Sequence, residues 1–89
     1  MTPPQILEEL EAACARLGIQ VVYAELTGEG MSTGGLCRVK DEWRVIADRR
    51  ASAGEKVSIL SRALSGFDLE GMFLSPQARE VVARHRESR

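Results

Sequence analysis

The stretch LCRVKDEWRVIA (residues 36–47) predicts a β-hairpin, with strands over residues 36–39 and 43–47 and a turn through residues 40–42. In the second strand and the residue after it, two sets of residues alternate: Trp43, Val45 and Ala47 with Arg44, Ile46 and Asp48. An alternation with a period of two is typical of a β-strand, because successive side chains point to opposite faces of a sheet. The hairpin is therefore the element around which the other segments are arranged.

Upstream of the hairpin, the segment IQVVYAEL (residues 19–26) is rich in β-branched and aromatic residues and predicts a third strand. Apolar residues occur on both of its faces, which is typical of a strand that is interior or well covered. The intervening segment TGEGMSTGG (residues 27–35) contains four glycines and predicts a loop.

Helices are expected on both sides of these strands. Thr2 and Gln5 form a capping-box pattern before the apolar periodicity of residues 6–17, and Ser52 and Glu55 form another before a second helical pattern. A last helix is expected to start at Pro76. The sequence thus predicts a single domain over residues 1–89 of α/β (α+β) class. Its small, mainly antiparallel three-stranded sheet is packed by three helices in the order α-β-β-β-α-α.

The composition limits the classes of function. The chain has 89 residues, a net charge of −1 and a hydrophobic fraction of 44%. A general nucleic-acid binder usually shows a basic excess, which is missing here. No stretch approaches the roughly 20 apolar residues of a membrane span, and the N-terminus has no signal-peptide pattern. We therefore expect a bacterial-type cytoplasmic protein with free cysteines and no membrane partner.

No motif predicts a catalytic site. The chain contains one histidine, His85, and two separated cysteines, Cys14 and Cys37, without the close ligand pairs of a zinc site. The glycine-rich loop departs from the dinucleotide-binding fingerprint and precedes a strand instead of a helix. We therefore expect no catalytic residue, no metal and no cofactor. The loop is left with one alternative role, contact with a ligand or partner through its tip, formed by Met31, Ser32 and Thr33.

Two sets of residues are candidates for binding another protein. The first is an apolar run that is either core or an exposed interface, and it comprises Leu69, Met72, Phe73 and Leu74. The second is a set of basic residues on the hairpin, expected as its polar rim, and it comprises Arg38, Lys40, Arg44 and Arg49. With Arg50, the basic set is also the candidate site for a phosphate, RNA or an acidic protein, although charge on an edge strand also prevents unwanted pairing.

An expected helix, strand and glycine-containing loop are followed by GGLCRVKDEWRVIADRR (residues 34–50) and SAGEKVSILSRALSGFDL (residues 52–69). This order of segments resembles the minimal scaffold of ImmA/IrrE-type zinc metallopeptidases. The resemblance covers about residues 5–68. That family carries an H-E-x-x-H motif on the helix after the hairpin, where this chain has residues 62–66, RALSG. Both histidines and the glutamate are absent, so the resemblance implies a scaffold used for recognition and implies no peptidase activity.

Three functions follow as expectations. The first is a small cytoplasmic interaction or regulatory module, not an enzyme, that binds another protein or itself. The second is a binder of nucleic acid or an anionic ligand through the basic residues of the hairpin, which the charge balance disfavours. The third is a subunit or remnant of a metallopeptidase-like protein.

Overall fold

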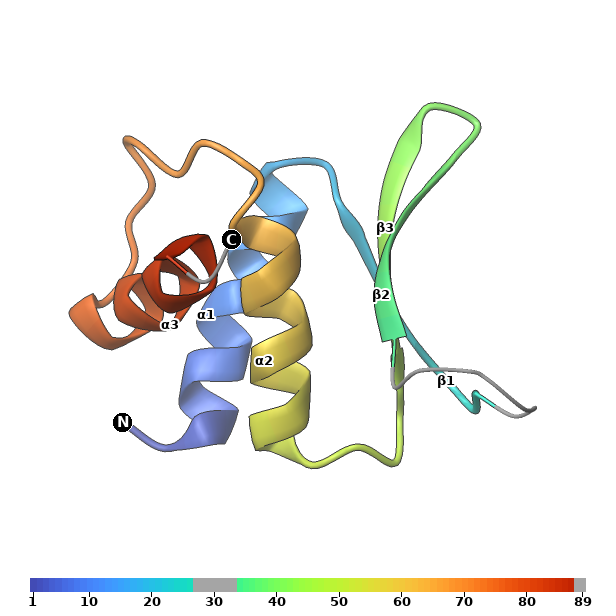
Figure 1. Ribbon diagram of the computed structural model, residues 1–89, viewed down its shortest axis with the longest axis horizontal. Helices are drawn as coiled ribbons and strands as arrows, with labels where there is room; N and C mark the ends of the chain where they lie inside the picture. The colour runs from blue at the N-terminus through green and yellow to red at the C-terminus, as the bar shows by residue number, and fades with distance from the viewer. Residues whose placement is uncertain (27–33, 88–89) are drawn as a thin grey trace.

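The computed structural model describes residues 1–26 and 34–87, which form three helices and a three-stranded sheet (Figure 1). The elements are α1 (Pro3–Arg16), β1 (Gln20–Ala24), β2 (Gly34–Val39), β3 (Glu42–Asp48), α2 (Ala53–Leu64) and α3 (Pro76–Glu87). The predicted class and element order are confirmed. In the part of the chain that the structure describes, no helix is long and apolar enough to cross a membrane.

Both predicted capping patterns start a helix. The backbone N–H of Thr2 donates to the side-chain oxygen of Gln5 at 2.9 Å, at the start of α1. At the start of α2, the Ser52 hydroxyl accepts a hydrogen bond from the backbone N–H of Glu55 at 3.1 Å. These bonds satisfy backbone groups that a helix end leaves without an intrahelical partner.

The sheet is mixed, with the strand order β1-β3-β2, whereas a mainly antiparallel sheet was expected. β2 and β3 form the predicted antiparallel hairpin, and β1 pairs in parallel with the other edge of β3. The turn is shorter than expected, because only Lys40 and Asp41 lie outside the strands, both with positive φ. Positive φ at both central residues suits a two-residue hairpin turn. β3 lies at the centre of the sheet and carries Val45 and Ala47, which are fully buried.

Gly34 belongs to β2, whereas the sequence placed it in the preceding loop. Its φ of +145° lies in a region that L side chains rarely adopt. A Cβ atom at this position would lie 2.0 Å from the carbonyl oxygen of Ile46 on β3. Only glycine therefore fits where β2 begins to pair with β3.

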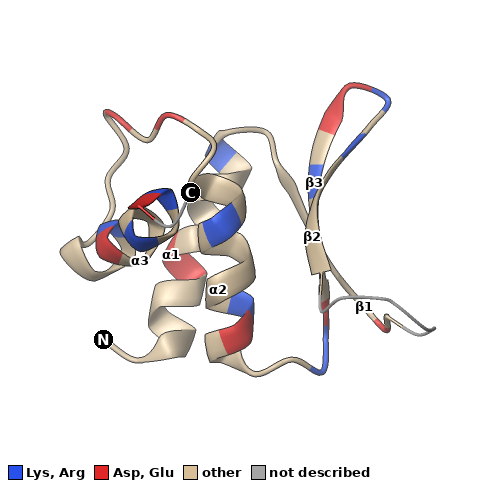
Figure 2. Ribbon diagram, in the orientation of Figure 1, with Lys and Arg blue, Asp and Glu red and all other residues tan. Residues whose placement is uncertain are grey.

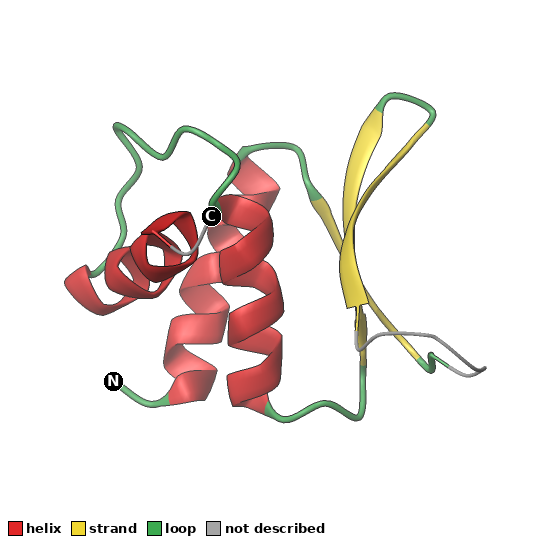
Figure 3. Cartoon of the chain, in the orientation of Figure 1, coloured by secondary structure: helices red, strands yellow, loops and turns green. Residues whose placement is uncertain are grey.

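The elements form three layers. The sheet lies on one side of the α1 and α2 pair, and α3 lies on the other side (Figures 1 and 3). The core between them is mainly aliphatic, with Leu10, Leu60, Leu64, Val45 and Val82 fully buried or nearly so. Trp43 adds an edge-to-face ring contact with Phe67, at 5.6 Å between centroids.

The helices cover only one face of the sheet. Contacts between helices and strands come from α1 and α2, which lie on the same side (Figure 1). The register puts Val22 and Ala24 of β1 beside Ile46 and Asp48 of β3, on the face opposite the buried Val45 and Ala47. The expectation that β1 is interior or covered on both faces is therefore wrong for the described residues: β1 is an edge strand, and the outer face of the sheet has no helix over it.

Candidate functional site

The apolar run between α2 and α3 divides into buried and exposed residues. Leu69 retains 5% of its accessible surface and belongs to the core. Met72 and Leu74 are partly buried against that core. Phe73 is 90% exposed, the highest value among the exposed large hydrophobic residues of the described chain. The structure thus makes Leu69 a core residue and leaves Phe73 as a surface residue between two partly buried neighbours.

Hydrogen bonds from two helices hold this segment in place. The guanidinium of Arg79 on α3 donates to the carbonyl oxygen of Met72. On the other side of Phe73, the carboxylate of Glu9 on α1 accepts from the backbone N–H of Ser75 at 2.9 Å and from its hydroxyl at 2.6 Å. Phe73 is therefore displayed by a segment that is fixed before and after it.

A shallow hollow of about 190 Å³ adjoins Phe73. Its lining comes from α1 and from the fixed segment: Glu9, Ala12, Ala13, Arg16, Met72, Phe73 and Leu74. The two alanines leave space beside the larger apolar side chains, and the two charged residues provide opposite charges on α1. An apolar side chain of modest size has room to lie here, next to Phe73.

The basic residues of the hairpin do not form the expected rim of this segment. The hairpin contacts α2 and β1 and makes no contact with α3, and it lies on the opposite side of the helix pair from residues 69–75 (Figure 1). The physical reason is the arrangement in layers, in which α1 and α2 separate the sheet from α3. The two sets of residues therefore cannot belong to one compact interface.

Acidic neighbours also offset most of the charge of that basic set. Four arginines have a carboxylate within 4 Å, in the pairs Arg38–Asp41, Arg44–Glu42, Arg49–Glu25 and Arg50–Asp48. Figure 2 accordingly shows both signs of charge on the hairpin and its flanks. Arg38 also lies over the ring of Trp43, at 5.4 Å from the centroid. A surface of mixed charge gives weak attraction to a polyanion.

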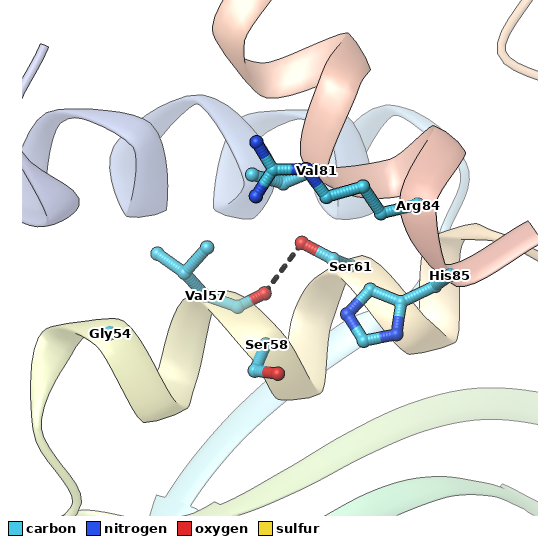
Figure 4. Close-up of a pocket in the computed structure, with 7 residues that line it drawn as sticks. All are labelled: Gly54, Val57, Ser58, Ser61, Val81, Arg84 and His85. Carbon is cyan, nitrogen blue, oxygen red and sulfur yellow. Dashed lines mark hydrogen bonds between the residues drawn. The ribbon is translucent and has the colours of Figure 1, made fainter. Parts of the chain in front are cut away.

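A second hollow, of about 210 Å³, lies between α2 and α3 (Figure 4). It is lined by Gly54, Val57, Ser58, Ser61, Val81, Arg84 and His85. The buried Ser61 hydroxyl donates to the carbonyl oxygen of Val57 at 2.6 Å, so its proton is already engaged. Burial, and then the charge of Arg62, lower the pKa of His85. Arg84 bonds to Glu80 at 2.9 Å.

The sequence interpretation did not identify this hollow. Its signal is a stripe of small residues on α2, Gly54, Ser58 and Ser61, at spacings of four and three. Residues so spaced share one helix face, and small side chains leave space where another helix crosses. That signal indicates close helix packing as readily as it indicates a binding site.

The remaining candidates lie apart from both hollows. Cys14 is fully buried on α1, where burial, followed by the charge of Glu11, raises its pKa to about 11. Cys37 is half-buried on β2, and both cysteines are free thiols. Within residues 1–26 and 34–87, no group of three or more His, Cys, Asp or Glu side chains is placed to hold a metal ion. The predicted loop contact through residues 31–33 lies outside the described residues.

Protein-family models, curated proteins and solved structures give no match to this chain. The resemblance to the ImmA/IrrE scaffold therefore stays a prediction from the sequence. In the structure, residues 62–64 of the expected motif position form the last turn of α2, and residues 65–66 follow the helix.

Proposed function

We propose that this chain is a small cytoplasmic protein-interaction module, without catalytic activity, that binds another protein through Phe73 and the adjoining hollow. The observation that carries the proposal is the 90% exposure of Phe73 on a segment that is hydrogen-bonded in place. Exposing a whole phenyl ring forgoes the stabilisation of about 2 kcal/mol that burial of such a side chain provides. Binding a partner recovers that free energy.

The fixed segment favours binding because it lowers the entropy cost of association. A mobile loop must be ordered when a partner binds, which costs about 0.5–1.5 kcal/mol for each immobilised flexible side chain. Here the hydrogen bonds of Arg79 and Glu9 already hold the backbone on both sides of Phe73. Aromatic anchors of this kind often carry a large share of the binding free energy of an interface.

The hollow specifies what the partner presents. Its apolar surface beside Ala12 and Ala13 suits an aliphatic side chain, while Phe73 enters an apolar pocket of the partner. Glu9 and Arg16 lie at the same hollow and provide polar contacts for the rim. The partner we infer is therefore a protein surface with one apolar projection next to one apolar recess.

The chemistry of the candidate nucleophiles also favours binding over catalysis. A thiol with a pKa of about 11, as for Cys14, stays protonated near neutral pH, and the thiolate is the nucleophilic form. The anion-binding alternative is less well supported, because the hairpin arginines have the carboxylate neighbours described above. It predicts a mobility shift of RNA or DNA at low salt.

The test compares capture of partners by the wild-type chain, Phe73→Ala and Leu36→Ala. Leu36 is the control, because it is another large apolar residue with an exposed side chain. Its exposed fraction is 37%, and it lies on β2, away from Phe73. We expect a partner retained by wild type and by Leu36→Ala to bind Phe73→Ala more weakly by about 2 kcal/mol, as for an interface anchor. The melting temperature of Phe73→Ala should stay close to that of the wild type.

Two results contradict the proposal. One is equal partner affinity for Phe73→Ala and wild type. The other is a marked loss of thermal stability in Phe73→Ala, which would make this residue part of the packed structure.

A further inference from the structure

The outer face of the sheet is an apolar surface with charges along its centre. Each position of β3 on this face has neighbours on one or both other strands, as the register shows. Ile46 lies between Val22 and Gly35, and Arg44 lies between Gln20 and Cys37. Val39, beside Glu42, is 38% exposed. Among the described residues no helix packs on this face, which Figure 1 shows as the side of the sheet turned away from α1 and α2.

One feature of β1 indicates that this face is covered by something. β1 carries apolar residues on both of its faces, although only the face of Val21 and Tyr23 looks toward the helices. A sheet with one face in water usually alternates apolar and polar residues instead.

The order of charges along β3 identifies the occupant. On the outer face β3 carries Glu42, Arg44, Ile46 and Asp48 in sequence, so Arg44 and Asp48 lie at equal distances on either side of an isoleucine. Consider a two-fold axis that lies in the plane between the two sheets, runs perpendicular to the strands and passes beside Ile46. It places Arg44 of each copy opposite Asp48 of the other. An axis at Arg44 would instead oppose two like charges, which is unfavourable.

We propose that a second copy of this chain packs face to face on the outer sheet surface, with Ile46 at the two-fold axis and Arg44 paired with Asp48 across the interface. Packed sheets lie about 10 Å apart, a distance that an arginine and an aspartate side chain together can span. The pairing adds a second carboxylate to the Arg44 guanidinium, which already has Glu42 of its own chain at 3.7 Å. Asp48 keeps its bonds to Arg50, because a carboxylate accepts several hydrogen bonds at once.

The size of the face sets the strength of the association. Three strands at about 4.8 Å spacing and five to seven residues at about 3.3 Å each give a face of roughly 14 by 20 Å. This is roughly 300 Å² per copy, less than the roughly 800 Å² per partner of a standard stable interface, so the association is weak and transient. We therefore expect a concentration-dependent dimer with a dissociation constant on the order of 100 µM.

The acidic residues on the face select against other occupants. Glu42 and Asp48 on the same strand oppose a nucleic acid or an anionic membrane. A different protein with a complementary surface is the other outcome, and the experiment below separates it from a second copy.

Sedimentation equilibrium measures the association, using the full chain at concentrations up to about 1 mM, ten times the expected dissociation constant. Arg44→Glu and Asp48→Arg are tested separately and then mixed. In a dimer of either variant alone, both contacts between residues 44 and 48 bring like charges together. Each variant should therefore dimerise at least tenfold more weakly than wild type. In the mixture, both contacts between unlike chains are opposite in charge, so a one-to-one heterodimer should form with near wild-type affinity.

Ile46→Thr is the second variant, because it keeps a β-branched residue on the strand and removes apolar area from the axis. It should fold and dimerise at least fivefold more weakly, since the apolar contact occurs at the two-fold axis. Phe73→Ala should dimerise like wild type. This control distinguishes the present proposal from the proposed function, because it changes a residue on the other side of the molecule.

A wild-type chain that stays monomeric up to the highest concentration overturns the proposal, whatever Phe73 binds. So does a dimer that all three outer-face variants form as tightly as wild type, since another surface then makes the contact. Loss of dimer in the single charge variants, with recovery in their mixture, supports the pairing directly. If the charge variants lose their circular-dichroism signature, the result for Ile46→Thr decides.

Discussion

The replacement of Gly34 by alanine tests the central register of the sheet. A methyl group at this position would lie 2.0 Å from the carbonyl oxygen of Ile46 and 2.7 Å from the Cα of Ala47. Ordinary contacts begin near 3.4 Å, so β2 and β3 must part by more than an ångström. Because both obstructing atoms belong to the backbone, no rotation of a side chain can relieve the clash.

The cost can be worked from two contributions. Overpacking against a fixed neighbour costs about 1–3 kcal/mol, and a residue held in a sparsely populated backbone region costs a similar amount. We expect Gly34→Ala to lower the free energy of unfolding by about 3 kcal/mol, a large part of the total stability of a domain of this size. The corresponding fall in melting temperature is about 10–20 °C.

Thermal and urea unfolding followed by circular dichroism measure the effect, and Gly35→Ala is the matched control. A Cβ at Gly35 meets no atom within 4 Å. That variant should therefore differ from wild type by less than about 1 kcal/mol, with the difference set by backbone entropy. A Gly34→Ala chain that melted within about 2 °C of wild type would refute the register of β2 on β3.

Three further predictions use other parts of the fold. Leu69→Ala should lower the free energy of unfolding by about 2–4 kcal/mol in urea unfolding, since Leu69 is buried, and Phe73→Ala by less than about 1 kcal/mol. In the native protein near pH 8, a thiol reagent should label Cys37 and leave Cys14 unreacted until the chain unfolds, because burial raises the pKa of Cys14 to about 11. Equal labelling rates would contradict the burial of that thiol. Burial and a neighbouring guanidinium lower the pKa of His85 below its ordinary value of 6.5, so its contribution to stability is present above that pH and is lost as the pH falls through the folded-state pKa. His85→Asn should reduce the loss of melting temperature between about pH 7 and about pH 5, and an unchanged loss would exclude this role.

Local patterns were sufficient to predict the elements but not the arrangement of the strands. The capping groups Thr2 and Ser52 and the hairpin around residues 40–41 are set by neighbours in sequence, and the structure shows each of them. The position of β1 beside β3 depends on which strand is buried most completely after the helices pack. The apolar residues on both faces of β1 favoured an interior position and contain no information about which strand it pairs with.

The candidate site shows the same limit at the level of single residues. Leu69 and Phe73 are both large apolar residues in one short segment, and the sequence left open whether they are core or interface. Their exposures differ because Glu9 and Arg79, from two helices, fix the path of the chain between them. Such long-range contacts, one of them across 66 residues, are not contained in any local pattern.

The parallel pairing of β1 with β3 affects how the chain emerges from the ribosome. β1 pairs with β3, from Gln20 opposite Arg44 to Ala24 opposite Asp48, so its partner lies further along the chain. β2 and β3 are adjacent along the chain. The hairpin can therefore form from local contacts, whereas β1 must wait for β3 to be synthesised before it has a neighbour. Until then β1 has no strand neighbour, and an unpaired strand edge beside apolar side chains favours aggregation during folding.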